Sequence, residues 1–484
     1  MKNTSSLYIL WKKHNPKGGF MEFSSITFLL IFLPTVILTY FVSPKRFRNI
    51  VLLIFSFIFY AWTDLFYLPI LIVTILLDYC SGRLIFTLQK KKNTRNIVFI
   101  ATLFIHLLIL LQFKYQLLPL HKICKSVNVL SIQNLIPIGI SIYSLQGLSY
   151  IIDLYLNKIK VQKNIIHLAT YISFFPQLIC GPIVRYSDMG NELESREENY
   201  NKISKGYSLF IRGLAKKIFL ADNMLLFWWD IQEIDTQSLP ILTAWIGILA
   251  FSFAVYFYLS GYSEMARGIG KIFGFELPIN FNYPYIAKSV SEFWRRWNTT
   301  LTVWCKTYIF TAFGKNKGSF FLITLKLLGL WVLTGLWYGH SLNFVLWGLF
   351  LGIIIIFEKI FWGGLFSRFP SILQKLYTRI ITLLAWVIFA IPDIHQIPKY
   401  LQAMFSGKWV DNQTIYLTQK YILLFVICFL CCSNFWYILS LKYEHKRPKL
   451  TQWTQVILEC ILTIVCLIYI ISGQVPLTNF FVRF

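Results

Sequence analysis

Long apolar stretches separated by short polar turns dominate the chain. They recur at residues 23–41, 50–62, 67–78, 98–111, 241–259, 380–391 and 421–439. A helix needs about 20 mostly apolar residues to cross the hydrocarbon core of a membrane. The pattern therefore predicts an all-α, polytopic membrane protein with roughly a dozen transmembrane and re-entrant helices.

The middle of the chain differs from its two ends. Residues 1–130 and 366–484 look like ordinary lipid-facing helices, whereas residues 135–347 mix apolar runs with Pro, Gly, Arg and Asn. Proline frees backbone groups, and a charge at membrane depth costs several kcal/mol unless protein or water satisfies it. We therefore expect broken or re-entrant helices around Pro137, Pro176, Pro182, Pro278 and Pro284, and we look for the function there.

Composition excludes a soluble protein. Of the 484 residues 56% are hydrophobic and only 14% are charged, against about a quarter charged in soluble domains. The net charge of +25 would suggest nucleic acid in a soluble chain. Here the basic residues concentrate in loops such as 44–48 and 90–95, as cytoplasmic loops beside anionic lipids do, so we expect a bilayer and no nucleic-acid partner.

The loop charges also predict a topology. The turn at 63–65 has no basic residue, so the first spans fit an outside start followed by alternation. Residues 1–20 would then place four lysines outside, which favours Met21 as the native start; a tail that tolerates translocation is the alternative.

Without a linker or repeat, residues 21–484 are predicted to form a single membrane domain. The nine cysteines lack metal-site spacing and indicate no bound metal.

The segment 280–310 is the densest in aromatic and basic residues. Its spacing predicts an amphipathic helix over 289–304, with Phe293, Trp294, Trp297, Leu301 and Trp304 on one face. The neighbouring basic side chains suit phosphates, because guanidinium groups pair bidentately with them; they are Lys288, Arg295 and Arg296. The alternative is an interfacial helix anchored by its Trp and Arg residues.

Two further segments carry candidate chemistry. His340, within the run 333–352, lies far from any charged loop and is a candidate proton acceptor, although a structural histidine is the alternative. Gln177 and Arg185 lie near the helix break at 176–182, where free backbone groups can meet a ligand. A kinked helix with Arg185 at the interface is the alternative there. His106 is interpreted as structural.

Ordered motifs along most of the chain from Met21 carry a family resemblance. They read MEFSSITFLLIFLP, RNIVLLIFSFIFYAW, PIGISIYSLQGLSYIIDLY, YISFFPQLICGPIVRYSD, GLAKKIFLADN, LSGYSEMARGIGKIFGFELPINFNYPYIAKSVSEFWRRW and GLWYGHSLNFVLWG. The sequence resembles the membrane-bound O-acyltransferases (MBOAT), in the bacterial branch of alginate O-acetylases and teichoic-acid D-alanylation proteins.

The resemblance implies helices around a central tunnel that brings an acyl donor from the cytoplasmic side to a hydroxyl acceptor. It implies acetyl-CoA or another acyl thioester as substrate, no bound cofactor, and a cell-surface or exported polysaccharide as acceptor. A histidine in the tunnel would act as base on the hydroxyl. The resemblance also implies a bacterial cytoplasmic membrane location and an extracytoplasmic partner of the SGNH hydrolase type.

Two positions depart from the family pattern. The signature RRWH reads RRWN here, with Asn298 in place of the histidine, and WHG reads WYG, with Tyr338 in place of the expected base. A neighbouring LRDY pattern reads CKTY at 305–308. His340 supplies an imidazole for the site only if the backbone at Gly339 leaves the regular helix, because two helical positions turn a side chain by about 200°.

The resemblance and the residues together give one set of candidate site residues. The catalytic candidates are His340, Asn298 and Tyr338; the donor-binding candidates are Lys288, Arg295, Arg296 and Arg185; the tunnel-lining candidates are Trp294, Trp297, Trp304, Trp337 and Gln177.

Two other functions stay open. A catalytically impaired member would keep the tunnel as a scaffold or acyl conduit for a partner acyltransferase, and the replacement of both histidines favours it. A secondary transporter predicts inverted repeats and coupled acidic residues at midplane. Glu264 and Asp153 are the candidates for that, but no repeat is visible, so we rank this function last.

Overall fold

The chain folds into helices throughout the part that the structure describes. The structure is a computed structural model that describes residues 21–115, 137–310, 320–362, 368–435, 439 and 448–472, and no strand occurs in these ranges. The predicted extension at residues 1–20 lies outside the described residues. The all-α prediction is confirmed.

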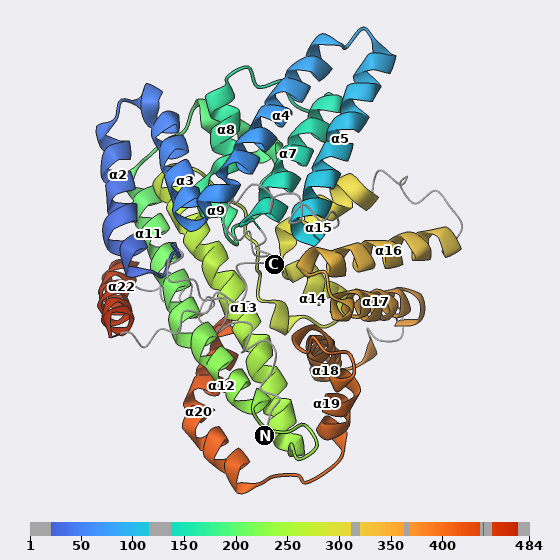
Figure 1. The fold of residues 1–484 in the computed structure, drawn as a ribbon. Coiled ribbons are helices and arrows are strands. Elements are labelled where there is room, and N and C mark those ends of the chain that lie inside the picture. Colours follow the sequence, from blue (N-terminus) through green and yellow to red (C-terminus); the bar gives the residue numbers. More distant parts are fainter. Residues whose placement is uncertain are drawn as a thin grey trace, which may run out of the picture.

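Helices of several lengths alternate along the chain (Figure 1). The first half contains α2 (Leu33–Val42), α3 (Arg48–Asp64), α4 (Leu68–Thr87), α5 (Lys92–Tyr115), α7 (Ile140–Tyr155), α8 (Ile165–Ser173), α9 (Phe175–Leu178), α10 (Tyr186–Glu194), α11 (Tyr200–Ala215) and α12 (Asp222–Gln232). The second half contains α13 (Ile241–Ile272), α14 (Val290–Arg296), α15 (Thr299–Trp304), α16 (Phe320–Tyr338), α17 (Leu342–Phe357), α18 (Ser371–Ala390), α19 (Gln396–Phe405), α20 (Asn412–Cys431) and α22 (Pro448–Ile471). Short 3₁₀ or π turns are η1 (Phe28–Phe32), η2 (Lys45–Phe47), η3 (Leu65–Tyr67), η5 (Lys216–Ala221), η6 (Pro284–Ile286), η7 (Cys305–Phe310) and η8 (Glu358–Trp362).

Eight helices of the described ranges are long and apolar enough to cross a membrane. They are Leu65–Thr87, Lys92–Tyr115, Ile241–Ile272, Phe321–Tyr338, Leu342–Ile360, Ser371–Ala390, Asn412–Cys431 and Gln452–Ile471. Two shorter apolar helical stretches, Phe28–Val42 and Ile165–Leu178, accompany them. The chain is therefore a multi-pass membrane protein.

Helix α13 is the centre of the fold. It runs through the middle of the molecule, with α11 and α12 on one side and α14, α17 and α18 on the other (Figure 1). Glycines let α11 and α13 approach closely: a Cβ atom at Gly206 would lie 2.7 Å from the Gly268 carbonyl oxygen, and one at Gly213 would lie 2.5 Å from that of Gly261. The helix pair is therefore packed backbone against backbone.

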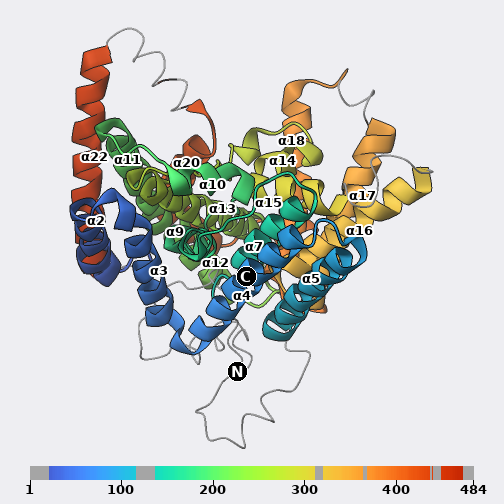
Figure 2. The same ribbon diagram turned by 90° about the horizontal axis from the view of Figure 1, so that it is seen from above.

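Two groups of helices surround this centre. Helices α4, α5 and α7 pack together as one group, and α16 and α17 form a hairpin that contacts α18 and α14. Helix α22 stands at one edge of the molecule beside α11 (Figure 2). The site described below lies where the α16–α17 hairpin meets α14 and α15.

The middle of the chain contains the expected interruptions. Helix α8 ends at Ser173, α9 is only four residues long with Pro176 in its first turn, and the chain is irregular from there to α10. The single helix predicted over 289–304 is wrong: it is divided into α14 and α15. Trp297, with φ −96° and ψ 127°, is extended and ends the first helix, and Asn298, whose φ of 44° lies in the left-handed region, comes directly before the second.

Candidate functional site

A cavity of about 310 Å³ lies between α14–α15 and the α16–α17 hairpin. Its wall is mostly apolar and carries a few polar side chains. The lining residues are Ser291, Trp294, Arg295, Trp297, Asn298, Leu301, Thr302, Cys305, Lys306, Phe310, Leu327, Leu330, Trp331, Thr334, Tyr338 and Ile355. An apolar pocket with a few convergent polar groups is the usual form of a small-molecule site.

The two altered signature positions meet on this wall. The Asn298 side-chain amide donates a hydrogen bond to the Tyr338 hydroxyl, with 3.4 Å between Nδ2 and Oη. Asn298 comes from the break between α14 and α15, whereas Tyr338 is the last residue of α16. The structure thus brings together residues 40 positions apart that family resemblance alone had grouped.

Tryptophans hold the α14 side of the cavity in place. Trp294 packs edge-on against Trp347, with ring centroids 5.2 Å apart, and Trp297 packs against Trp386 at 5.2 Å. All four rings are buried. Of the aromatic tunnel candidates, Trp294 and Trp297 line the cavity, whereas Trp304 and Trp337 are not among its lining residues.

A buried carboxylate fixes the start of α14. Glu358, in η8, accepts hydrogen bonds from the backbone N–H groups of Val290 and Ser291 at 2.7 and 2.9 Å. It also accepts one from the Ser291 hydroxyl at 2.7 Å. An acidic group at this end satisfies free N–H groups and complements the helix dipole. Glu358 therefore positions the helix that leads to Asn298.

The end of α16 is held from α5. The buried Lys114 side-chain nitrogen donates hydrogen bonds to the carbonyl oxygen of Trp337 and to the Ser141 hydroxyl, and it lies 4.7 Å from the Trp337 ring centroid. The Tyr115 hydroxyl donates to the Leu336 carbonyl at 2.7 Å. These two carbonyls belong to the last turn of α16 and are free to accept such bonds. Helix α5 thus fixes the turn that presents Tyr338.

His340 lies outside the cavity wall. The helix does end before Gly339, as the hypothesis for His340 required, and α17 begins at Leu342. The His340 side chain is nevertheless exposed in this turn and is not among the residues that line the cavity. No histidine lines it within the described part of the chain.

The four donor-binding candidates are separated. Arg295 is exposed and lines the cavity. Arg296 pairs with Glu292, with 2.8 Å between Nη2 and Oε1. Lys288 is exposed and is not part of the wall, and Arg185 forms a two-point pair with Asp188 at 2.9 Å for each contact. Of these cations only Arg295 faces the cavity.

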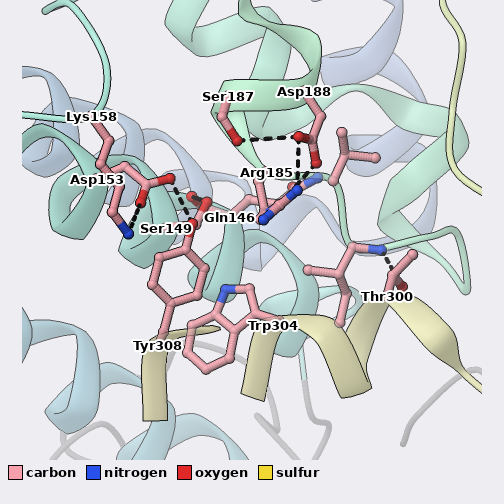
Figure 3. A network of polar contacts seen from close by, with 12 residues as sticks. Gln146, Ser149, Asp153, Lys158, Arg185, Ser187, Asp188, Thr300, Trp304 and Tyr308 are labelled. Atoms are coloured by element: carbon pink, nitrogen blue, oxygen red, sulfur yellow. Dashed lines mark hydrogen bonds and ion pairs between the residues drawn. The ribbon is translucent and has the colours of Figure 1, made fainter. Parts of the chain in front are cut away.

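A second polar network ties α15 and η7 to the α7 side of the fold (Figure 3). The Tyr308 hydroxyl donates to the Asp153 carboxylate at 2.6 Å, and Lys158 lies 3.6 Å from the same carboxylate. The Trp304 indole N–H donates to the Leu145 carbonyl at 3.0 Å. Tyr308 and Trp304 therefore lock the segment behind the cavity in place.

Three other predicted residues have structural contacts. Gln177 is buried and accepts a hydrogen bond from Gln146. Asp153 pairs as described above and Glu264 pairs with Lys216 at 2.5 Å, so both acidic residues of the transporter hypothesis have cationic partners. Within the described ranges no group of three or more His, Cys, Asp or Glu side chains is placed to hold a metal.

Sequence reasoning missed some polar residues near the site. Lys306 lines the cavity, and Lys114 supports it from behind. His106, interpreted as structural, is fully buried and lies 2.8 Å from Asp78, which is also buried. The signal for Lys114 was present, since it is an ionisable residue inside an apolar run, but its partners are distant in sequence.

Comparison with known proteins identifies the family. The model of the MBOAT, membrane-bound O-acyltransferase family, matches residues 57–391. The chain is 33% identical over 399 residues to the probable alginate O-acetylase AlgI of Pseudomonas aeruginosa, covering 80% of this chain and 76% of the relative. It is 32% identical over 421 residues to the peptidoglycan O-acetyltransferase of Helicobacter pylori, covering 79% of each. With the teichoic acid D-alanyltransferase of Bacillus subtilis it shares 28% identity over 249 residues, 48% of this chain and 62% of the relative. The cavity walled by the two signature segments and these matches lead to one conclusion: the chain belongs to the membrane-bound O-acyltransferase family.

Proposed function

We propose that the chain transfers an acyl group, most simply acetyl from acetyl-CoA, to hydroxyls of a cell-surface or exported polysaccharide. It would do so in a bacterial cytoplasmic membrane, with an extracytoplasmic SGNH-type protein as partner. Relatives named for O-acetylation of alginate and peptidoglycan support the acetyl group and the glycan acceptor. The observation that carries the proposal is the contact between Asn298 and Tyr338 on the wall of one cavity.

The reaction needs three contributions from the site. The acceptor oxygen attacks the thioester carbonyl, the C–O bond forms, the C–S bond breaks, and the hydroxyl proton passes by way of a base to the departing thiolate. The Asn298 amide and the Tyr338 hydroxyl are hydrogen-bond donors that suit the carbonyl oxygen as it gains negative charge. Arg295 and Lys306 suit the donor's phosphates.

The base in this proposal is His340. It lies in the turn that directly follows Tyr338, and an imidazole is better matched to neutral pH than a phenol with its ordinary pKa near 10. His340 would act from the exposed side of the α16–α17 turn, which joins the cavity wall at Tyr338.

A second function is favoured by one specific observation. No histidine lines the cavity within the described residues, so the wall lacks the group that family resemblance assigns as base. A scaffold or acyl conduit that serves a partner acyltransferase needs the cavity but not the base.

Transfer from labelled acetyl-CoA in membranes tests the first function. Tyr338→Phe removes one donor and is expected to lower the rate about 10²-fold or more, and His340→Ala is expected to lower it about 10²- to 10⁴-fold. His395→Ala is the matched control, because His395 is exposed in a different turn and its loss should leave transfer unchanged. Full transfer by both site variants would refute the assignment of these two residues.

A restoration experiment separates the two functions. If the wild-type chain transfers nothing while the double variant Asn298→His/Tyr338→His gains activity, the chain is a scaffold that has lost its chemistry. If the wild-type chain is active and Tyr338→His changes only its rate, the chain is an enzyme with an altered site.

A further inference from the structure

A second cavity, of about 570 Å³, opens at the turn between α2 and α3. Unlike the first, it is lined largely by polar and charged side chains. Its lining residues come from η2, the start of α3, the start of α8 and the segment after α10, and they include Lys45, Arg46, Arg48, His167, Arg196 and Glu198. This turn is one of the two basic loops that the sequence predicts to be cytoplasmic.

Two partly buried arginines form the floor of the cavity. Arg48 and Arg196 both pair with Glu198, at 3.0 and 3.8 Å, and the exposed fractions of the three side chains are 13%, 7% and 8%. The Arg196 guanidinium also donates to the Asn49 side chain at 2.7 Å and to the Tyr40 hydroxyl at 3.0 Å. The arginines are therefore fixed before any ligand arrives.

The rim of the cavity has an excess of positive charge. Lys45 and Arg46 are exposed, and neither forms an ion pair within the described residues. The lining contains four basic side chains against the two carboxylates Glu194 and Glu198. Glu198 is already paired with the floor, and the other carboxylate, Glu194, is exposed, so the lining keeps an excess of basic side chains for an anion.

An exposed apolar stripe begins at the cavity. Ile50 lines the cavity, and Ile54 and Ile58 lie one and two turns further along the same face of α3, with 51% and 43% of their surface exposed. Phe47, also in the lining, is half exposed, and Val42 at the end of α2 is 83% exposed. In a membrane protein such exposed side chains meet acyl chains.

We propose that this cavity binds the phosphate headgroup of an anionic phospholipid, whose acyl chains lie along the Ile54–Ile58 face of α3. A phosphate at this place would meet Lys45 and Arg46 and would lie at the N-terminal end of the 17-residue helix α3, whose dipole favours an anion. The inference does not depend on the proposed acyltransferase function, because it concerns a different cavity.

Native mass spectrometry of the purified, delipidated chain tests the inference, with phosphatidylglycerol and phosphatidylcholine as probes. The double variant Lys45→Gln/Arg46→Gln should bind phosphatidylglycerol about tenfold or more weakly, since each basic residue near a membrane surface contributes to holding an anionic lipid. Its binding of phosphatidylcholine should not change. Both side chains are exposed, so the variant is expected to fold.

The matched control is Lys90→Gln/Lys91→Gln, which removes the same charge from the other basic loop, where neither residue lines this cavity. An equal loss in this control would overturn the inference in favour of diffuse surface attraction. Inorganic pyrophosphate distinguishes a soluble phosphate from a lipid. If it binds at the cavity as tightly as phosphatidylglycerol and displaces it, the ligand is a soluble phosphate and the lipid assignment fails.

Discussion

Asn298 combines an unusual backbone with a chemical contact. Its φ of 44° and ψ of 55° lie in the left-handed region, which costs most residues about 1–2 kcal/mol but in which Asn, Asp and His are enriched. The same position can therefore hold Asn here and His in the family signature without a change of backbone. The residue type is constrained by conformation as well as by chemistry.

Three variants at this position separate the two constraints. Asn298→Gly removes the amide without backbone strain, so it should fold normally and lose most acyl transfer. Asn298→Ala should lose the same activity and also about 1–2 kcal/mol of stability, whereas Asn298→His should keep the stability. Thermal unfolding in detergent and transfer from labelled acetyl-CoA measure both quantities. Full activity of Asn298→Gly would show that the amide is not needed.

Glu198 makes stability depend on pH. Burial raises the pKa of its carboxyl, but hydrogen bonds from Tyr40 and Arg48 outweigh this, so the net pKa lies below the ordinary value of 4.5. A group whose folded pKa is depressed stabilises the fold above its unfolded pKa and loses that contribution as pH falls through the folded value. The melting temperature should therefore fall steeply below about pH 4.5.

Glu198→Gln should flatten that acidic fall, with Glu197→Gln, an exposed neighbour, as the control. Burial lowers the pKa of His167, so its protonation also destabilises the fold as pH falls below its unfolded pKa of about 6.5. That effect occurs at higher pH and is common to all three proteins. If the melting temperature falls with pH in the same way in Glu198→Gln and in the wild type, the contacts of Glu198 with Tyr40 and Arg48 do not cause the acid dependence.

The contact between α11 and α13 depends on the absence of side chains. A Cβ atom at Gly213 would lie 2.5 Å from the Gly261 carbonyl oxygen and 2.8 Å from the Met265 nitrogen, both of them backbone atoms. Gly213→Ala must therefore push the helices apart and should cost about 1–3 kcal/mol. Gly329→Ala in α16 is the control, because nothing lies within 4 Å of its added Cβ. Equal melting temperatures for the two variants would contradict close packing.

The α5–α16 contact is expected to control the last turn of α16. Replacing Lys114 by Met leaves the Trp337 carbonyl without its side-chain donor, and such a bond contributes about 0.5–1.5 kcal/mol. Hydrogen exchange of the backbone around residues 335–339 should accelerate about tenfold or more. Lys92→Met, at the other end of α5, should not change it. Unchanged exchange in Lys114→Met would show that the hairpin with α17 alone holds this turn.

The whole molecule has a predicted orientation that labelling can check. If the basic loops are cytoplasmic, a membrane-impermeant maleimide should label Leu65→Cys in intact cells, and Lys90→Cys only after permeabilisation. The parent chain, with its own cysteines, gives the background. The opposite pattern would invert the topology and place the α2–α3 cavity outside.

Sequence alone predicted the membrane class and the location of the broken helices, because hydrophobic length and proline act locally. Through the family signatures it also grouped Asn298 with Tyr338, and the two side chains are in contact in the structure. It did not predict that α14 and α15 are separate, since the left-handed backbone at Asn298 is invisible in a hydrophobic pattern. Nor did it predict that Arg295 lines the cavity whereas Arg185 pairs with Asp188. The partner of a basic side chain depends on which residues the fold brings next to it.

The bond from Lys114 to Trp337 joins residues 223 positions apart. During synthesis α5 and α7 enter the membrane long before α16 exists, so until then Lys114 has only the Ser141 hydroxyl of α7 as an acceptor, and an ionisable group at membrane depth that lacks part of its partners is costly. We expect the first half of the chain to keep α5 near the translocation machinery or partly hydrated until the second half arrives. A truncation after α13 should therefore insert α5 poorly, even though that helix and its immediate neighbours are complete.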